Sequence, residues 1–213
     1  MKKVISGIAK FQNEVFPQNR DLFETLASGQ SPETLFITCS DSRIDPSMLT
    51  QTKPGDIFIC RNAGNIVPAY GEVVGGVSAT IEYAVLALQV KDIILCGHSD
   101  CGAMRALLNP QSVAGMPAVA AWLRYGESAR FVVQENHSHL TGADLVNAMI
   151  EQNVLAQLDN LRTHPSVSAR MATGRLKLHG WVYDIGSGQV RSHDPEQRLF
   201  VPLQAQAEVG SRR

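Results

Sequence analysis

The chain has 213 residues, which allows one domain or at most two small ones. Apolar residues make up 44% and charged residues 18% of the sequence. The charged share lies below the typical ~25%, which argues against disorder and coiled coil. The formal net charge is −1, so the overall charge attracts neither a phosphate backbone nor an anionic membrane. We therefore expect no nucleic-acid partner and no membrane partner.

Two features of the sequence predict a cytoplasmic protein. The longest apolar stretches, residues 77–90 and 92–97, fall short of the ~20 residues that span a bilayer. Near the N-terminus, polar residues at position 10 and positions 12–14 interrupt the apolar segment that a secretory signal would need. In a reducing compartment the four cysteines, at positions 39, 60, 96 and 101, are expected to be free thiols.

The first elements in the chain are two predicted amphipathic helices. Residues 2–16 place Val4, Ile8, Phe11 and Val15 at helical spacing, and Pro17 is expected to end this helix. A second helix is predicted from about residue 20 to residue 28, with a glycine as its stop signal. Both helices must cover an apolar surface, either the sheet of the same chain or a second subunit.

Short apolar runs then alternate with turn residues. We predict buried strands at residues 35–38, 57–60 and 93–96, and a buried crossover helix over residues 77–90. Strands that alternate with helices indicate an α/β fold with a mainly parallel central sheet and flanking helices.

The last third of the chain predicts a long helix and a terminal hairpin. The helix covers residues 141–162, with Leu145, Met149, Leu155 and Leu158 on one stripe. Alternating residues from position 176 to 183 predict a strand, and residues 186–188 provide the turn of an antiparallel edge hairpin. We expect residues 1–213 to form a single domain, with a weakly ordered tail from about residue 195.

Three potential metal ligands follow two of the predicted strands. The first strand runs into Cys39, and the third runs into the segment that carries His98 and Cys101. Functional residues gather beyond the carboxyl ends of parallel strands, so these side chains can converge. Gly102 and Ala103 then begin a helix, whose amino end favours a thiolate at Cys101.

Two thiolates and one imidazole are suitable ligands for Zn²⁺. With three protein ligands, a tetrahedral ion keeps a fourth position for water, which is the arrangement of a catalytic zinc site. If the residues are taken singly, the alternative is two small core cysteines and one satisfied loop histidine. Their joint placement favours a metal site. Cys60 and Cys96 lie inside apolar runs and are better explained as buried core residues.

Asp41 and Arg43 lie two and four residues after Cys39. A carboxylate this close to a ligand could bind the metal as a fourth ligand or accept a hydrogen bond from the metal's water. A bidentate pair with Arg43 would hold it away from the metal. The alternative is an ordinary surface ion pair.

Three motifs together resemble the β-class carbonic anhydrases: CSDSR at 39–43, RNAGN at 61–65 and GHSDCGA at 97–103, within a likeness that spans residues 2–185. The resemblance implies reversible, zinc-dependent hydration of carbon dioxide to bicarbonate by attack of zinc-bound hydroxide. It assigns Cys39, His98 and Cys101 as zinc ligands, and Asp41 and Arg43 as the catalytic dyad.

The resemblance also implies a substrate pocket and an oligomer. The positions that match the family's pocket are Gln30, Phe58, Ala63, Tyr83 and the backbone amide of Gly102. In that family the pocket residues come partly from a neighbouring subunit, around which the N-terminal helices wrap. A homodimer or a higher even homo-oligomer is therefore expected.

A departure from the family pattern concerns regulation. The subclass that bicarbonate inhibits at an allosteric site has Trp and Gly where this chain has Phe36 and Thr38, although Tyr183 matches that site's third member. We therefore predict no cooperative inhibition by bicarbonate. The stretches GQSPETLFITCSDSRIDP and HGWVYDIGSG most resemble the bacterial subgroup associated with cyanate degradation.

Other functional classes fit the sequence less well. A zinc deaminase needs H-x-E and P-C-x-x-C, and a nucleotide-binding module needs a glycine-rich phosphate loop after a strand; the sequence contains neither signature. A structural or redox-sensing zinc–thiolate protein remains the main alternative. His137 and His139 could form a proton relay or a second metal site, but two exposed loop histidines are the preferred interpretation.

Overall fold

The structure is a computed structural model that describes residues 1–73 and 75–203. A six-stranded sheet has the order β2-β1-β3-β4-β5-β6, in which β1 to β4 are parallel and β5 and β6 antiparallel. The strands are β1 (Thr34–Cys39), β2 (Ile57–Asn62), β3 (Asp92–His98), β4 (Lys177–Tyr183), β5 (Val190–Asp194) and β6 (Leu199–Pro202).

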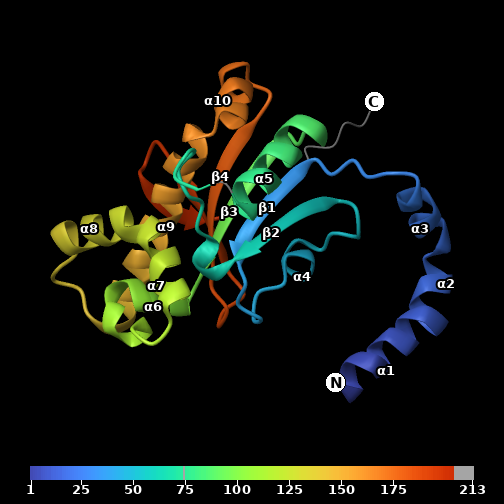
Figure 1. The fold of residues 1–213 in the computed structure, drawn as a ribbon, viewed down its shortest axis with the longest axis horizontal. Coiled ribbons are helices and arrows are strands. Elements are labelled where there is room, and N and C mark those ends of the chain that lie inside the picture. Colours follow the sequence, from blue (N-terminus) through green and yellow to red (C-terminus); the bar gives the residue numbers. More distant parts are fainter. Residues whose placement is uncertain (74, 204–213) are drawn as a thin grey trace.

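Helices surround this sheet (Figure 1). The α-helices are α1 (Lys2–Lys10), α2 (Phe16–Gln18), α3 (Arg20–Ala27), α4 (Pro46–Thr50), α5 (Gly76–Glu82), α6 (Gly102–Leu108), α7 (Pro117–Leu123), α8 (Glu127–Asn136), α9 (Gly142–Thr163) and α10 (Pro165–Ala172). The 3₁₀ and π segments are η1 (Phe11–Val15), η2 (Ala63–Asn65), η3 (Tyr83–Ala87), η4 (Pro110–Val113) and η5 (Arg124–Gly126). The fold class predicted from the sequence is confirmed.

The N-terminal helices stand away from the body of the chain (Figure 1). The apolar side chains of Val4, Ile8, Phe11 and Val15 are exposed, and α1, α2 and α3 contain no buried residue. The sequence left two surfaces that these helices could cover, the sheet of the same chain or a second subunit. The first alternative is wrong, because the sheet of this chain does not bury their apolar stripe.

The prediction that Pro17 ends the first helix is also wrong, because helical structure continues to Gln18. Pro17 occupies the first turn of α2, directly after the π segment η1. A proline is tolerated in a first turn because its missing N–H would have no helical partner there.

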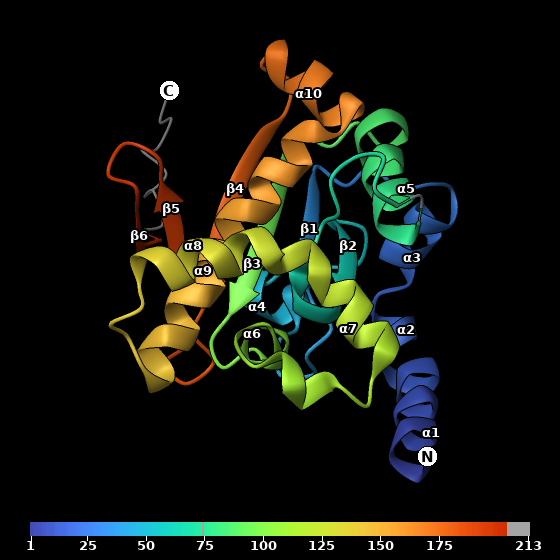
Figure 2. The same ribbon diagram turned by 60° about the vertical axis from the view of Figure 1, so that its left-hand side comes forward.

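The long helix α9 lies across β3 and β4 (Figure 2). Glycines allow this close approach: a Cβ on Gly97 would come within 3.0 Å of Val154, and one on Gly180 within 2.9 Å of Leu158. The predicted stripe is partly wrong, since Leu145 and Leu155 are only half-buried. The buried stripe comprises Val146, Met149, Ile150, Asn153, Val154, Gln157, Leu158 and Leu161.

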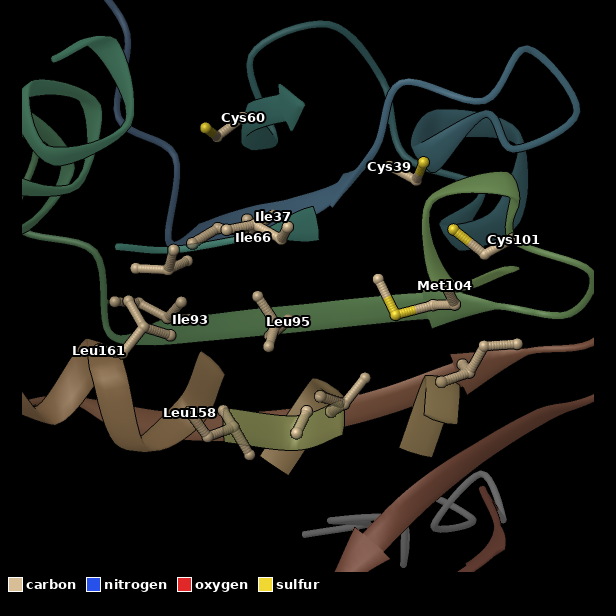
Figure 3. Packing of buried hydrophobic residues seen from close by; sticks show 14 of the residues in the cluster. Ile37, Cys39, Cys60, Ile66, Ile93, Leu95, Cys101, Met104, Leu158 and Leu161 are labelled. Carbon is tan, nitrogen blue, oxygen red and sulfur yellow. The ribbon is translucent and has the colours of Figure 1, made fainter. Parts of the chain in front are cut away.

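The core lies between the sheet and these helices, with Ile37, Leu95 and Leu158 packed along it (Figure 3). The crossover segment is less buried than predicted, because the side chains of Tyr83 and Leu86 are about half exposed. Part of the expected tail is a strand, since Leu199–Pro202 pairs with β5 as β6. Residues 204–213 lie outside the described residues.

Candidate metal centre

Cys39, His98 and Cys101 converge at the carboxyl ends of β1 and β3, as predicted. Their ligand atoms all lie within 4.8 Å of one another, and all three residues are buried. Cys39 ends β1, His98 ends β3, and Cys101 precedes the first turn of α6. The side chains of Cys39 and Cys101 lie on facing segments of the chain, and the sulfur of Cys101 points toward Cys39 (Figure 3).

The hydrogen bonds of His98 fit a metal ligand. Its Nδ1 lies 2.9 Å from the carbonyl oxygen of Ser99, which makes Nδ1 the protonated nitrogen. Nε2 is buried and has no hydrogen-bond partner among the described residues. A buried lone pair without a partner costs free energy, and coordination of a metal by Nε2 removes that cost.

The two thiols shift each other's pKa. Hydrogen bonding with the Cys101 side chain lowers the pKa of the Cys39 thiol to about 4. The pKa of Cys101 is raised, because Cys39 is its hydrogen-bond partner and because the group is buried. The backbone N–H of Gly64 also donates to the sulfur of Cys39 at 3.4 Å. The contacts with Cys101 and Gly64 both favour the thiolate form of Cys39.

Asp41 and Arg43 form the bidentate pair that the sequence suggested. Nε of Arg43 donates to Oδ1 of Asp41 at 3.0 Å, and Nη2 donates to Oδ2 at 2.8 Å. The backbone N–H of Arg43 donates to Oδ1 at 3.0 Å. Hydrogen bonds from Arg43 hold the pKa of Asp41 well below its usual range. Oδ2 of Asp41 lies 3.9 Å from Nε2 of His98, so the carboxylate borders the metal centre.

The expected pocket residues do not all gather at the metal centre within one chain. Phe58 pairs with Leu35 in the sheet, whereas Cys39 pairs with Asn62, four residues further along β2. Four residues of a strand span about 13 Å. Phe58 contacts Tyr83, with ring centroids 6.0 Å apart. Gln30 is exposed and precedes the amino end of β1.

The other two pocket positions lie nearer the ligands. Ala63 directly follows β2, and its carbonyl oxygen accepts a hydrogen bond from the indole of Trp122 at 2.8 Å. Gly102 is the first residue of α6, next to Cys101. The expected pocket is therefore divided between the two ends of the sheet.

Several residues that position the site were not assigned a role from the sequence. Arg61 donates to the carbonyl oxygens of Cys39, Asp41 and Ile44 at 3.0, 2.7 and 2.9 Å, which holds the ligand loop in place. On α9, Asn153 donates to the carbonyl oxygen of Gly64 at 3.1 Å. The available signal was a pair of amide residues, Asn153 and Gln157, four positions apart on an apolar helix face.

The other cysteines and histidines lie outside this centre. Cys60 and Cys96 are buried, as predicted, and burial raises the pKa of the Cys96 thiol to about 12. His137 and His139 lie near one another, with ring centroids 6.3 Å apart. No further cluster of three or more metal-ligating side chains occurs in the part of the chain that the structure describes.

A parallel sheet with a Cys-His-Cys group at its carboxyl edge is the arrangement of an α/β protein with a three-ligand zinc site, which leaves one coordination position free. The family model described as "Carbonic anhydrase" matches residues 34–190. A carbonic anhydrase from Pseudomonas aeruginosa is 50% identical over 98% of this chain and 94% of its own length. "Carbonic anhydrase 1" from Escherichia coli O157:H7 is 56% identical over 98% of this chain and 95% of its own length.

Solved structures agree. The β-carbonic anhydrase CcaA superposes with a TM-score of 0.93 at 47% identity, covering 95% of this chain and 99% of its own. A tetrameric β-carbonic anhydrase from Sordaria macrospora gives 0.81 at 33% identity, covering 90% of this chain and 95% of its own. The chain belongs to the β-class carbonic anhydrase family, whose members hydrate carbon dioxide with zinc. The family expectation from the three motifs is confirmed.

Proposed function

We propose that Cys39, His98 and Cys101 hold the zinc ion and that Asp41 and Arg43 act beside it in the hydration of carbon dioxide. The observation that carries this assignment is Nε2 of His98, which is buried and has no hydrogen-bond partner among the described residues, in a group of three residues whose ligand atoms lie within 4.8 Å of one another. The lowered pKa of Cys39, with the backbone N–H of Gly64 donating to its sulfur at 3.4 Å, supports the same donor set. When bound, zinc supplies a Lewis acid that lowers the pKa of water toward neutrality.

Asp41 orients the attacking oxygen. Its Oδ2 borders the centre, and the ionised carboxylate would accept a hydrogen bond from the attacking water and so turn an oxygen lone pair toward carbon dioxide. Arg43 keeps Asp41 in this role because its two side-chain hydrogen bonds hold both carboxylate oxygens. If Arg43 releases Asp41, the carboxylate can become the fourth ligand, which closes the site.

We propose that the substrate pocket is assembled from two subunits. Phe58 and Tyr83 are about 13 Å along the sheet from the level of Cys39, so they fit the pocket of a neighbouring subunit better than that of their own chain. Their apolar rings suit carbon dioxide, whereas Gln30 and the backbone amide of Gly102 suit the oxygens of bicarbonate. The exposed apolar stripes of α1 and η1 support a homodimer or a higher even homo-oligomer.

Two finer assignments are also proposed. A cytoplasmic location is supported by the four free cysteines, two of which must be reduced to bind zinc. Among the described residues, no helix is long and apolar enough to cross a membrane. Membership of the subgroup associated with cyanate degradation is supported by the two sequence stretches given above. Loss of cyanate tolerance after deletion of the gene would test it.

The central test is stopped-flow measurement of carbon dioxide hydration together with zinc content. We expect one zinc ion per chain and turnover that disappears when zinc is removed and returns when zinc is restored. A zinc–thiolate sensor would retain the ion but hydrate no carbon dioxide. That result would refute the proposed function while leaving the ligand assignment intact.

A further inference from the structure

The spacer between two of the metal ligands carries a second contact for Arg43. Ser99 and Asp100 separate His98 from Cys101. Oδ2 of Asp100 accepts a hydrogen bond from Nη1 of Arg43 at 3.0 Å. The carbonyl oxygen of Asp100 accepts another from Nη2 at 3.1 Å. Asp100 therefore binds Arg43 with both its side chain and its backbone.

These bonds do not compete with those to Asp41. A guanidinium group has five N–H donors. Arg43 uses Nε and one N–H of Nη2 for Asp41, and Nη1 and the other N–H of Nη2 for Asp100. One arginine thus joins the loop after β1 to the loop after β3, and its two carboxylate partners lie on different edges of the same planar group.

Arg105 fixes the far side of Asp100. Nε of Arg105, on α6, donates to Oδ1 of Asp100 at 2.7 Å, and its Nη2 donates to the same oxygen. Charges therefore alternate along a row from Arg105 through Asp100 and Arg43 to Asp41. Each charged group in this row is adjacent only to groups of opposite charge. Each ion pair therefore stabilises the position of the next.

The backbone of Asp100 has an uncommon conformation. Its φ of 57° lies in the left-handed region, which aspartate adopts more readily than most residues. The side chain of Arg43 is 44% exposed. An exposed arginine with one partner would sample many rotamers, whereas contacts on two edges restrict it to few.

We propose that Asp100, braced by Arg105, is a positioning residue that holds Arg43 in the orientation in which it restrains Asp41. Loss of the Asp100 charge frees Arg43, and Asp41 then spends more time as a ligand of the metal. This inference rests on the roles proposed for Asp41 and Arg43. It adds a control element that lies within the ligand motif itself.

The test uses the zinc-loaded and cobalt-loaded full chain with Asp100→Asn and Arg105→Met. Exchanging an ionised acceptor for a neutral one weakens a hydrogen bond enough to change an equilibrium by roughly fivefold to tenfold. For Asp100→Asn we expect kcat to fall by up to that factor at unchanged KM. Arg105→Met should show a smaller effect in the same direction. Asp194→Asn, in a hydrogen-bonded turn of the C-terminal hairpin, is the matched control and should match wild type.

Two readouts are independent of turnover. In the cobalt-loaded chain, thiocyanate titration followed by visible absorption should give a higher apparent Kd for Asp100→Asn, by up to about fivefold to tenfold, because fewer molecules have a free coordination position. In NMR spectra of the metal-free chain, the Nε–H of Arg43 should exchange with water faster than in wild type.

The outcomes separate this inference from the proposed function. If Asp100→Asn has the same kcat, thiocyanate affinity and Arg43 Nε–H exchange rate as wild type, the positioning role of Asp100 is overturned. The role proposed for Asp41 is not affected by that result. A lower zinc content or unfolding temperature, with unchanged thiocyanate affinity of the loaded fraction, would also overturn it, since Asp100 would then only support the fold. Full activity of an Asp41 variant would instead refute the orienting role proposed for Asp41, and absence of carbon dioxide hydration in the wild type would refute the proposed function.

Discussion

Oδ2 of Asp41 lies 3.9 Å from Nε2 of His98, although the two side chains come from loops that follow different strands. The imidazole nitrogen has no hydrogen-bond partner among the described residues, and Arg43 binds the carboxylate from its other side. The carboxylate therefore lies beside the nitrogen that is available to a metal ion, while Arg43 holds both carboxylate oxygens. On this relationship we base the proposed ligand role of His98 and the proposed orienting role of Asp41.

Asp41→Ala tests that separation. Because Asp41 is not one of the three ligands, the variant should retain about one zinc ion per chain. It should lose most of its turnover, by about 10²-fold or more, because the attacking oxygen is no longer oriented. Zinc content and stopped-flow hydration of carbon dioxide are measured on the same preparation. Near-normal turnover would contradict the orienting role.

Cys39→Ala tests the donor set. Removal of one of three ligands should cause loss of zinc and of activity together. Cys60→Ala is a suitable control, because Cys60 is also buried on the neighbouring strand but lies outside the ligand group. The control should keep zinc and turnover. Full zinc occupancy in Cys39→Ala, measured by metal analysis after dialysis, would remove Cys39 from the set of ligands.

The strand ends were predictable because their signals are local. An apolar run that stops at a cysteine or before a Gly-His pair indicates both the strand and its carboxyl end. Cys39 and His98 lie at the carboxyl ends of β1 and β3. Parallel pairing of these strands then explains how residues distant in sequence converge. The metal ligands and the Asp41–Arg43 pair could be inferred at this level.

The contacts that support the site depend on packing that spacing does not reveal. Asn153 and Gln157 are buried on an apolar helix face because the loop after β2 exposes backbone groups that need partners there. The course of the chain through Pro17 likewise depends on a π segment that no simple periodicity indicates. Phe11 and Leu86 lie at apolar positions of their segments yet are exposed, so the sequence pattern overstates burial within one chain.

The pH profile follows from the charges at the site. Two thiolates reduce the positive charge on zinc, so the metal is a weaker acid than in a three-histidine site, and activity should rise through the mildly alkaline range. Asp41 does not produce this rise: Arg43 depresses the pKa of Asp41, so the carboxylate is ionised throughout the neutral and alkaline range. A rate of hydration that is flat from acidic to alkaline pH would contradict this expectation.

Asn153→Leu tests the support from α9. The substitution removes the donor to the carbonyl oxygen of Gly64 and the acceptor for Gln157, both buried. Leaving these groups unpaired should lower the free energy of unfolding by about 1–3 kcal/mol. Asn147→Leu, on an exposed face of the same helix, should change it by less than about 0.5 kcal/mol. Equal urea midpoints for the two variants would show that Asn153 does not support the loop.

Inhibition by bicarbonate is expected to be weak and hyperbolic. The reason is that Phe36 and Thr38, which replace the Trp and Gly of the inhibited subclass, already have partners within the chain. Phe36 is fully buried and packs edge-on against Trp181, with ring centroids 6.2 Å apart. The hydroxyl of Thr38 donates to the carbonyl oxygen of Cys96 at 2.8 Å, which leaves it no free donor for an anion.

Initial rates measured over a range of bicarbonate concentrations at constant ionic strength should fit a Hill coefficient of about 1. Tyr183→Phe should give the same curve as wild type, since a tyrosine alone does not form the site. A steep sigmoidal curve that Tyr183→Phe abolishes would show that an anion site persists despite Phe36 and Thr38.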